Sequence, residues 1–94
     1  MRRFALCLIQ LIATPAIADG DASWEAFRKD VATACLALVE GPGEKQIEVN
    51  PFGSQSYGVA QVDLTAPAGT DRMVCIYDKA TKTAELSGPF LPKP

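Results

Sequence analysis

The sequence predicts a small α+β domain: one amphipathic helix near the N-terminus packed on an antiparallel sheet of about four strands, with one disulfide from helix to sheet. Three observations lead to this prediction. Apolar residues recur at three- and four-residue steps before a Gly-Pro-Gly break at residues 41–43, they alternate after it, and one cysteine lies on each side of the break. This order is typical of a helix laid on a sheet.

Residues 1–18 have the features of a cleavable secretory signal. Arg2 and Arg3 form a positive start, residues 4–13 an apolar run, and the A-x-A motif at residues 16–18 predicts cleavage after Ala18. The apolar run is shorter than the roughly 20 residues that a membrane-spanning helix needs. Paired arginines also occur in twin-arginine signals, but we favour the general secretory route. We therefore expect a periplasmic or secreted protein without stable membrane insertion.

The repeat of three and four residues predicts a helix from about Ala22 to Val39. Gly41 and Pro42 stop it. Its apolar stripe, which we expect to face the sheet, consists of Trp24, Phe27, Val31, Ala34, Cys35 and Leu38.

The alternating repeat predicts strands at about residues 46–50, 56–65, 72–77 and 82–87, joined by loops at residues 51–54, 66–71 and 78–81. Gly58 and Ala60 share one face of the second strand, so the helix is expected to pack there, with room for Trp24 or Phe27. Residues 19–88 thus form one domain, followed by an extended proline-rich tail at residues 89–94.

The third predicted strand is apolar at five consecutive positions, residues 73–77. Such a run indicates that both faces are covered or that one face presents an apolar patch. If Cys75 points to the helix, Met73 and Tyr77 do so too, and Val74 and Ile76 point away. One helix covers only one face, so the other is open or is shielded by the tail or a partner.

Removal of residues 1–18 takes Cys7 with it and leaves two cysteines, Cys35 and Cys75. In an oxidising compartment this even count predicts one bridge. A core of this size supplies only about 3 to 5 kcal/mol, so the bridge is expected to carry much of the stability.

Composition argues against several classes of function. Loss of Arg2 and Arg3 changes the net charge from −2 to −4, and an acidic domain without a basic patch is a poor ligand for nucleic acid. The chain has no histidine, and its carboxylates show no metal-ligand spacing, so we expect neither a metal nor a cofactor.

The sequence offers two possible enzymatic sites. Residues 54–58 approximate a nucleophile elbow, but no histidine base exists, and Lys45 and Lys79 are expected to be solvated. A carboxylate-dependent enzyme is the remaining option, because four acidic side chains could approach one another across strands: Glu48, Asp63, Asp78 and Glu85.

A candidate interaction face is predicted on or beside the side of the sheet that faces away from the helix, formed by Phe52, Tyr57, Val59, Val74 and Ile76. The alternative is that Phe90 and Leu91 fold back over these residues as a second small core. The leading hypothesis is a non-enzymatic module that binds an envelope or secreted protein, and the alternatives are an accessory subunit of an envelope complex or a small carboxylate-dependent enzyme.

Overall fold

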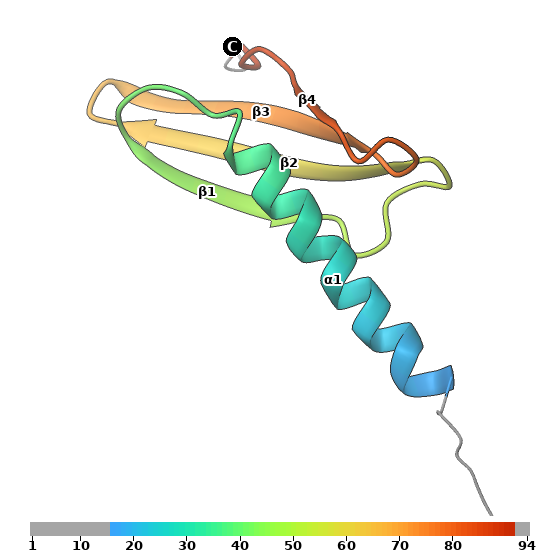
Figure 1. Ribbon diagram of the computed structural model, residues 1–94. Coiled ribbons are helices and arrows are strands. Elements are labelled where there is room, and N and C mark those ends of the chain that lie inside the picture. The colour runs from blue at the N-terminus through green and yellow to red at the C-terminus, as the bar shows by residue number, and fades with distance from the viewer. Residues whose placement is uncertain (1–15, 92–94) are drawn as a thin grey trace, which may run out of the picture.

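The computed structural model describes residues 16–91, so most of the expected signal segment lies outside the described residues. One helix, α1 (Ala16–Leu36), crosses one face of a four-stranded antiparallel sheet (Figure 1). The strands follow one another in space as in sequence: β1 (Glu44–Val49), β2 (Tyr57–Ala66), β3 (Gly69–Asp78) and β4 (Ala84–Leu86). The predicted α+β class is thereby confirmed. Within the described part of the chain, no helix is long and apolar enough to span a membrane.

The helix ends three residues earlier than predicted, and this changes which side chain enters the core. The amides of Leu38 and Val39 donate to the carbonyls of Cys35 (3.1 Å) and Leu36 (3.2 Å), a three-residue step that is tighter than the α-helical one. The tighter turn rotates Val39 inward, where it is 4% exposed, and leaves Leu38 39% exposed. Leu38 is therefore not part of the buried stripe.

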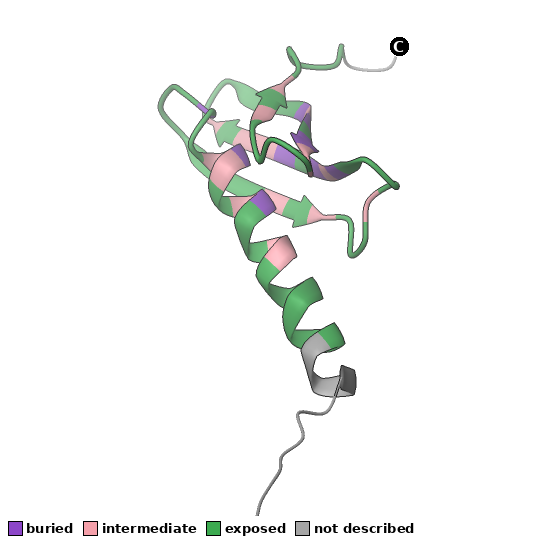
Figure 2. Cartoon of the chain, turned by 45° about the vertical axis from the view of Figure 1, so that its right-hand side comes forward, coloured by how far each residue is buried: buried purple, intermediate pink, exposed green. Residues whose placement is uncertain are grey.

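The N-terminal turns of α1 run beyond the sheet (Figures 1 and 2). Trp24, the first residue of the predicted stripe, is 37% exposed, whereas Val31 and Cys35 are completely buried. Figure 2 shows buried positions only on the C-terminal turns of the helix. The helix thus packs on the sheet with its second half, starting at the partly buried Phe27.

The hairpin formed by β2 and β3 has a shorter turn and longer strands than predicted. Ala66 lies opposite Gly69, so the loop expected at residues 66–71 is reduced to Pro67 and Ala68, and the neighbouring residues join the ladder. Proline presets the backbone for a turn, and Gly69 has a φ of 142°, which L side chains rarely adopt. The two strands therefore pair over ten residues each.

The last strand is shorter than predicted, but the chain after it still follows β3. The amide of Ser87 donates to the carbonyl of Val74 and that of Phe90 to the carbonyl of Arg72, both at 2.8 Å. Part of the proline-rich tail is therefore held along the edge of the sheet.

The core lies between α1 and the sheet. It consists of Val31, Cys35, Val39, Ala60, Val62, Met73, Cys75 and Tyr77. On β3 the buried residues alternate as predicted, and Cys35 is bonded to Cys75 with 6.0 Å between the Cα atoms. The predicted disulfide between helix and sheet is confirmed, and both cysteines are completely buried.

Helix α1 packs tightly against the sheet at Gly58. A Cβ atom at this position would lie 2.8 Å from Cγ2 of Val31 and 2.9 Å from Cζ of Phe27. The absence of a side chain therefore makes room for Phe27, as predicted.

The disulfide closes a loop with a sequence separation of 40, for which the loss of chain entropy in the unfolded state corresponds to about 4 kcal/mol. We expect Cys35→Ser, or Cys75→Ser, to leave the domain largely unfolded at 37 °C by circular dichroism. A variant that melts as cooperatively as the wild type, at a similar temperature, would contradict this. The mass of the oxidised wild type should rise by two hydrogen atoms on reduction.

Replacement of Gly58 by alanine should destabilise the fold by about 1 to 3 kcal/mol, because the new methyl group meets two packed side chains of α1. The measurement is urea unfolding of the oxidised protein. Gly88→Ala is the matched control, since its Cβ meets no atom within 4 Å. Equal stability of the two variants would show that the helix moves away from the sheet without cost.

Candidate interaction face

The side chains of the sheet that point away from α1 form the surface that we call the open face. Successive side chains of a strand alternate between faces, so the buried positions identify the residues on the other side. Helix α1 contacts all four strands from one side, and no described element covers the other. The open face consists of Glu44, Gln46, Glu48, Tyr57, Val59, Gln61, Asp63, Thr65, Thr70, Arg72, Val74, Ile76, Asp78 and Glu85.

A hollow of about 520 Å³ lies on the open face, at the end where β2 begins and β3 ends. Its apolar lining comes from Tyr57, Val59 and Ile76, and Val59 and Ile76 are direct partners across β2 and β3. Tyr57 is 45% and Ile76 47% exposed. The polar rim includes Asp78 and Glu85, and Glu85 is paired with Ile76 across β3 and β4.

Three of the five residues predicted for the interaction face line this hollow, and the other two lie elsewhere. Val74 is on the open face but outside the hollow and is half-buried. Phe52 is turned towards the helix, where its ring lies edge-on to Trp24 with 4.9 Å between centroids. The loop after β1 curls to the helix side, and a strand pattern gives no information on that direction.

The tail does not cover the hollow. Phe90 and Leu91 are exposed and border a second hollow of about 910 Å³ with Gly41, Pro42 and Leu64. The lining of this second hollow also includes Thr70 and Arg72, so it lies at the hairpin end of the sheet, opposite the end with the first hollow. The apolar residues of the open face are thus left without a cover from the described part of the chain.

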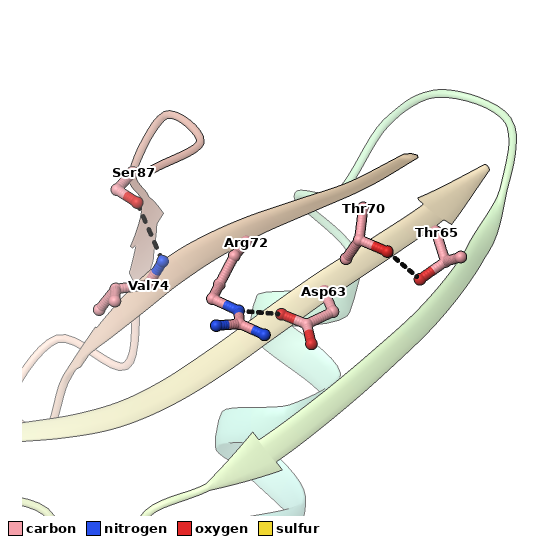
Figure 3. A network of polar contacts seen from close by, with 6 residues as sticks. All are labelled: Asp63, Thr65, Thr70, Arg72, Val74 and Ser87. Atoms are coloured by element: carbon pink, nitrogen blue, oxygen red, sulfur yellow. Dashed lines mark hydrogen bonds and ion pairs between the residues drawn. The ribbon is translucent and has the colours of Figure 1, made fainter. Parts of the chain in front are cut away.

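The hairpin end of the open face is polar (Figure 3). Nε of Arg72 lies 3.7 Å from Oδ1 of Asp63, and the hydroxyls of Thr65 and Thr70 are 3.1 Å apart. The Arg72 side chain is 62% exposed, whereas that of Asp63 is 22% exposed and its Oδ1 is buried without a hydrogen-bond partner among the described residues. This end of the open face is therefore polar, and the exposed apolar residues of the hollow lie at the opposite end.

Two turns shape the rim of the hollow. Oδ1 of Asp78 accepts hydrogen bonds from the amides of Ala80 (2.8 Å) and Thr81 (3.1 Å), which caps the turn before β4. The Ser54 hydroxyl accepts a hydrogen bond from the amide of Tyr57 at 3.0 Å and so orders the entry to β2. Ser54, which replaces the first glycine of the approximate nucleophile elbow, is thus used in the turn.

Lys79 is partly buried and is not the solvated side chain that the sequence suggested. Its Nζ donates to the carbonyl oxygens of Phe52 (3.1 Å) and Ser54 (2.7 Å). It also lies 5.0 Å from the ring centroid of Phe27 and 5.4 Å from that of Trp24. Lys79 therefore ties the loop after β1 to the helix, a role that depends on three segments far apart in sequence.

The sequence analysis did not include Asp78, Thr83 and Glu85, which line the hollow, in the candidate interaction face, although the signal was available. The predicted alternation places Thr83 and Glu85 opposite the inward residues of β4, and Asp78 follows Ile76 by two positions on β3. Asp78 and Glu85 are the two acidic residues that line the hollow, whereas Asp63 is paired with Arg72. Among the described residues, no group of three or more potential metal ligands occurs.

Burial raises the pKa of the Tyr77 phenol above its usual value, and the carboxylate of Asp30 adds to the increase. Tyr77 is directed away from the open face, with its ring 6.1 Å from that of Phe27. Its titration therefore concerns the packing of helix and sheet and leaves the charge of the hollow unchanged.

Comparisons with protein-family models, with curated proteins and with solved structures each found no match. The hollow on the open face, with its apolar lining and acidic rim, is the feature from which function is inferred below.

The raised pKa of Tyr77 predicts a loss of stability in alkali. Between the unfolded value of about 10 and the higher folded value, the unfolded state releases its proton first, so the free energy of unfolding falls as pH rises. The decrease of the urea midpoint above about pH 10 should be smaller in Tyr77→Phe than in the wild type. Tyr57→Phe, which alters an exposed phenol, should keep the wild-type decrease, and identical profiles for all three proteins would refute the assignment.

Proposed function

We propose that this protein is an exported, non-enzymatic binding module that holds a partner protein of the cell envelope or the secreted fraction through its open face. The observation that carries the proposal is the uncovered hollow lined by Tyr57, Val59 and Ile76. The signal features of residues 1–18 and the buried disulfide are compatible with an oxidising compartment.

An exposed tyrosine next to aliphatic residues is a common basis of protein recognition. Tyrosine offers a large, rigid contact area at low entropic cost, and interface energy concentrates on a few such side chains that become desolvated. Tyr57 and Ile76 are nearly half exposed on a rigid ladder of hydrogen bonds. A partner that covers them gains apolar burial without having to order the sheet first.

The sheet geometry favours binding over catalysis. The Ser54 hydroxyl beside the hollow is engaged with the backbone of Tyr57, and Asp78, one of the two acidic residues that line the hollow, caps a turn. An acid–base pair needs groups free to reach a substrate proton. The carboxylate of Asp78 serves the fold instead.

Photo-crosslinking in the exporting cell tests the proposal. A photoreactive amino acid at Thr83, on the exposed rim of the hollow, should give a discrete adduct of higher mass, and the same group at Lys29, on the exposed side of α1, should give none. The adduct should decrease roughly five- to thirty-fold with Tyr57→Ala, the effect of removing an interface anchor.

Equal adducts from both positions, or none from Thr83 in a folded and exported protein, would contradict the proposed face. The processed protein should begin at Asp19 by N-terminal sequencing. An isolated domain that is insoluble until a partner is co-expressed would instead indicate an accessory subunit.

A further inference from the structure

The charge of the protein is distributed unevenly between its two sides. The open face carries one cation, Arg72, and five carboxylates, those of Glu44, Glu48, Asp63, Asp78 and Glu85, so its net charge is −4. The other residues of 19–94 contain equal numbers of acidic and basic side chains. The whole net charge of the processed chain therefore resides on the face that is left uncovered.

We infer that the occupant of the open face is a basic protein segment that places an aliphatic side chain in the hollow and a lysine or arginine on each side of it. This inference rests on the proposed function and specifies the partner. An apolar lining selects an aliphatic group, and the carboxylates around it select cations. A second copy of the chain is disfavoured, because two faces of −4 would repel each other.

The positions of two carboxylates set the spacing of the cations. Glu48 is on β1 and Glu85 on β4, the two outer strands, with Val59 and Ile76 between them. Three strand spacings of about 4.8 Å, combined with the offset along the strands, separate these carboxylates by roughly 15 Å. An extended segment covers this distance in about four residues. The partner segment therefore carries its two cations about four residues apart, with the aliphatic residue between them.

Two carboxylates of the open face, those of Glu48 and Glu85, are available to a ligand. Glu48 and Glu85 are exposed, and neither forms an ion pair within the described residues. Arg72, the cation of this face, is engaged with Asp63 at the distant hairpin end. Glu85, which lines the hollow, and Glu48, which is paired with Gln61 outside its lining, are thus not neutralised by the sheet itself.

A short peptide probe tests the inference. An acetylated and amidated peptide Lys-Thr-Ile-Thr-Lys, titrated into the oxidised protein at low salt, should shift the NMR amide signals of Val59, Ile76 and Glu85 more than those of α1. The peptide Glu-Thr-Ile-Thr-Glu should not bind, and Lys-Thr-Ser-Thr-Lys should bind more weakly. Binding should weaken on going from about 0.05 to 0.5 M NaCl, because salt screens exposed charges.

Two double variants with the same change in net charge distinguish the effect of the open-face carboxylates on peptide binding from the effect of the overall charge. Glu48→Gln with Glu85→Gln should raise the Kd of the lysine peptide roughly three- to ten-fold, the range for the loss of two exposed charge pairs. Glu25→Gln with Glu40→Gln makes the same change in net charge on exposed positions away from the open face and should leave the Kd unchanged.

Equal effects of the two variants, binding of the glutamate peptide, lack of binding by the lysine peptide, or concentration-dependent dimerisation through the open face would each overturn the inference. Its failure is distinct from failure of the proposed function. A crosslink from Thr83 to a partner whose contacting segment lacks basic residues refutes the basic occupant and leaves the binding module intact.

Discussion

The packing of helix α1 on one face of the sheet, bonded there through Cys35 and Cys75, is the constraint on which the rest of the structure depends. Both sulfur-bearing residues are completely buried, and the bridge joins α1 to β3, which is paired on both sides. A domain this small buries a limited fraction of its surface, so a covalent link that restricts the unfolded chain has a large share in its stability. The bridge also holds β3 with Met73 and Tyr77 towards the helix.

Within residues 16–91, one helix packs on the four-stranded sheet and no element covers the second face. The helix uses only its C-terminal half for packing, and its N-terminal turns extend past the sheet. The tail after β4 runs along the edge of β3 towards the hairpin end of the sheet. The exposure of Tyr57 and Ile76 therefore follows from the arrangement of the elements within residues 16–91, and an apolar hollow results where β2 and β3 pair.

The charged residues have different roles on the two sides of the sheet. On the helix side, Lys79 donates to two backbone carbonyls and lies over the rings of Trp24 and Phe27. On the open face, Asp78 and Glu85 line the hollow and Arg72 is held at the far end. A lysine thus contributes to packing on the helix side, and the net negative charge lies on the open face.

The sequence by itself determined the class of fold, the bridge, and the division of β3 into inward and outward residues. These depend on local repeats and on cysteine number, which the order of residues displays directly. The tertiary structure alone decided that Leu38 is exposed, that Phe52 packs on Trp24, that Lys79 is engaged, and that Asp78 and Glu85 border one hollow. Each of these depends on where a turn directs the chain and on contacts between distant segments, and neither property is encoded in a local repeat.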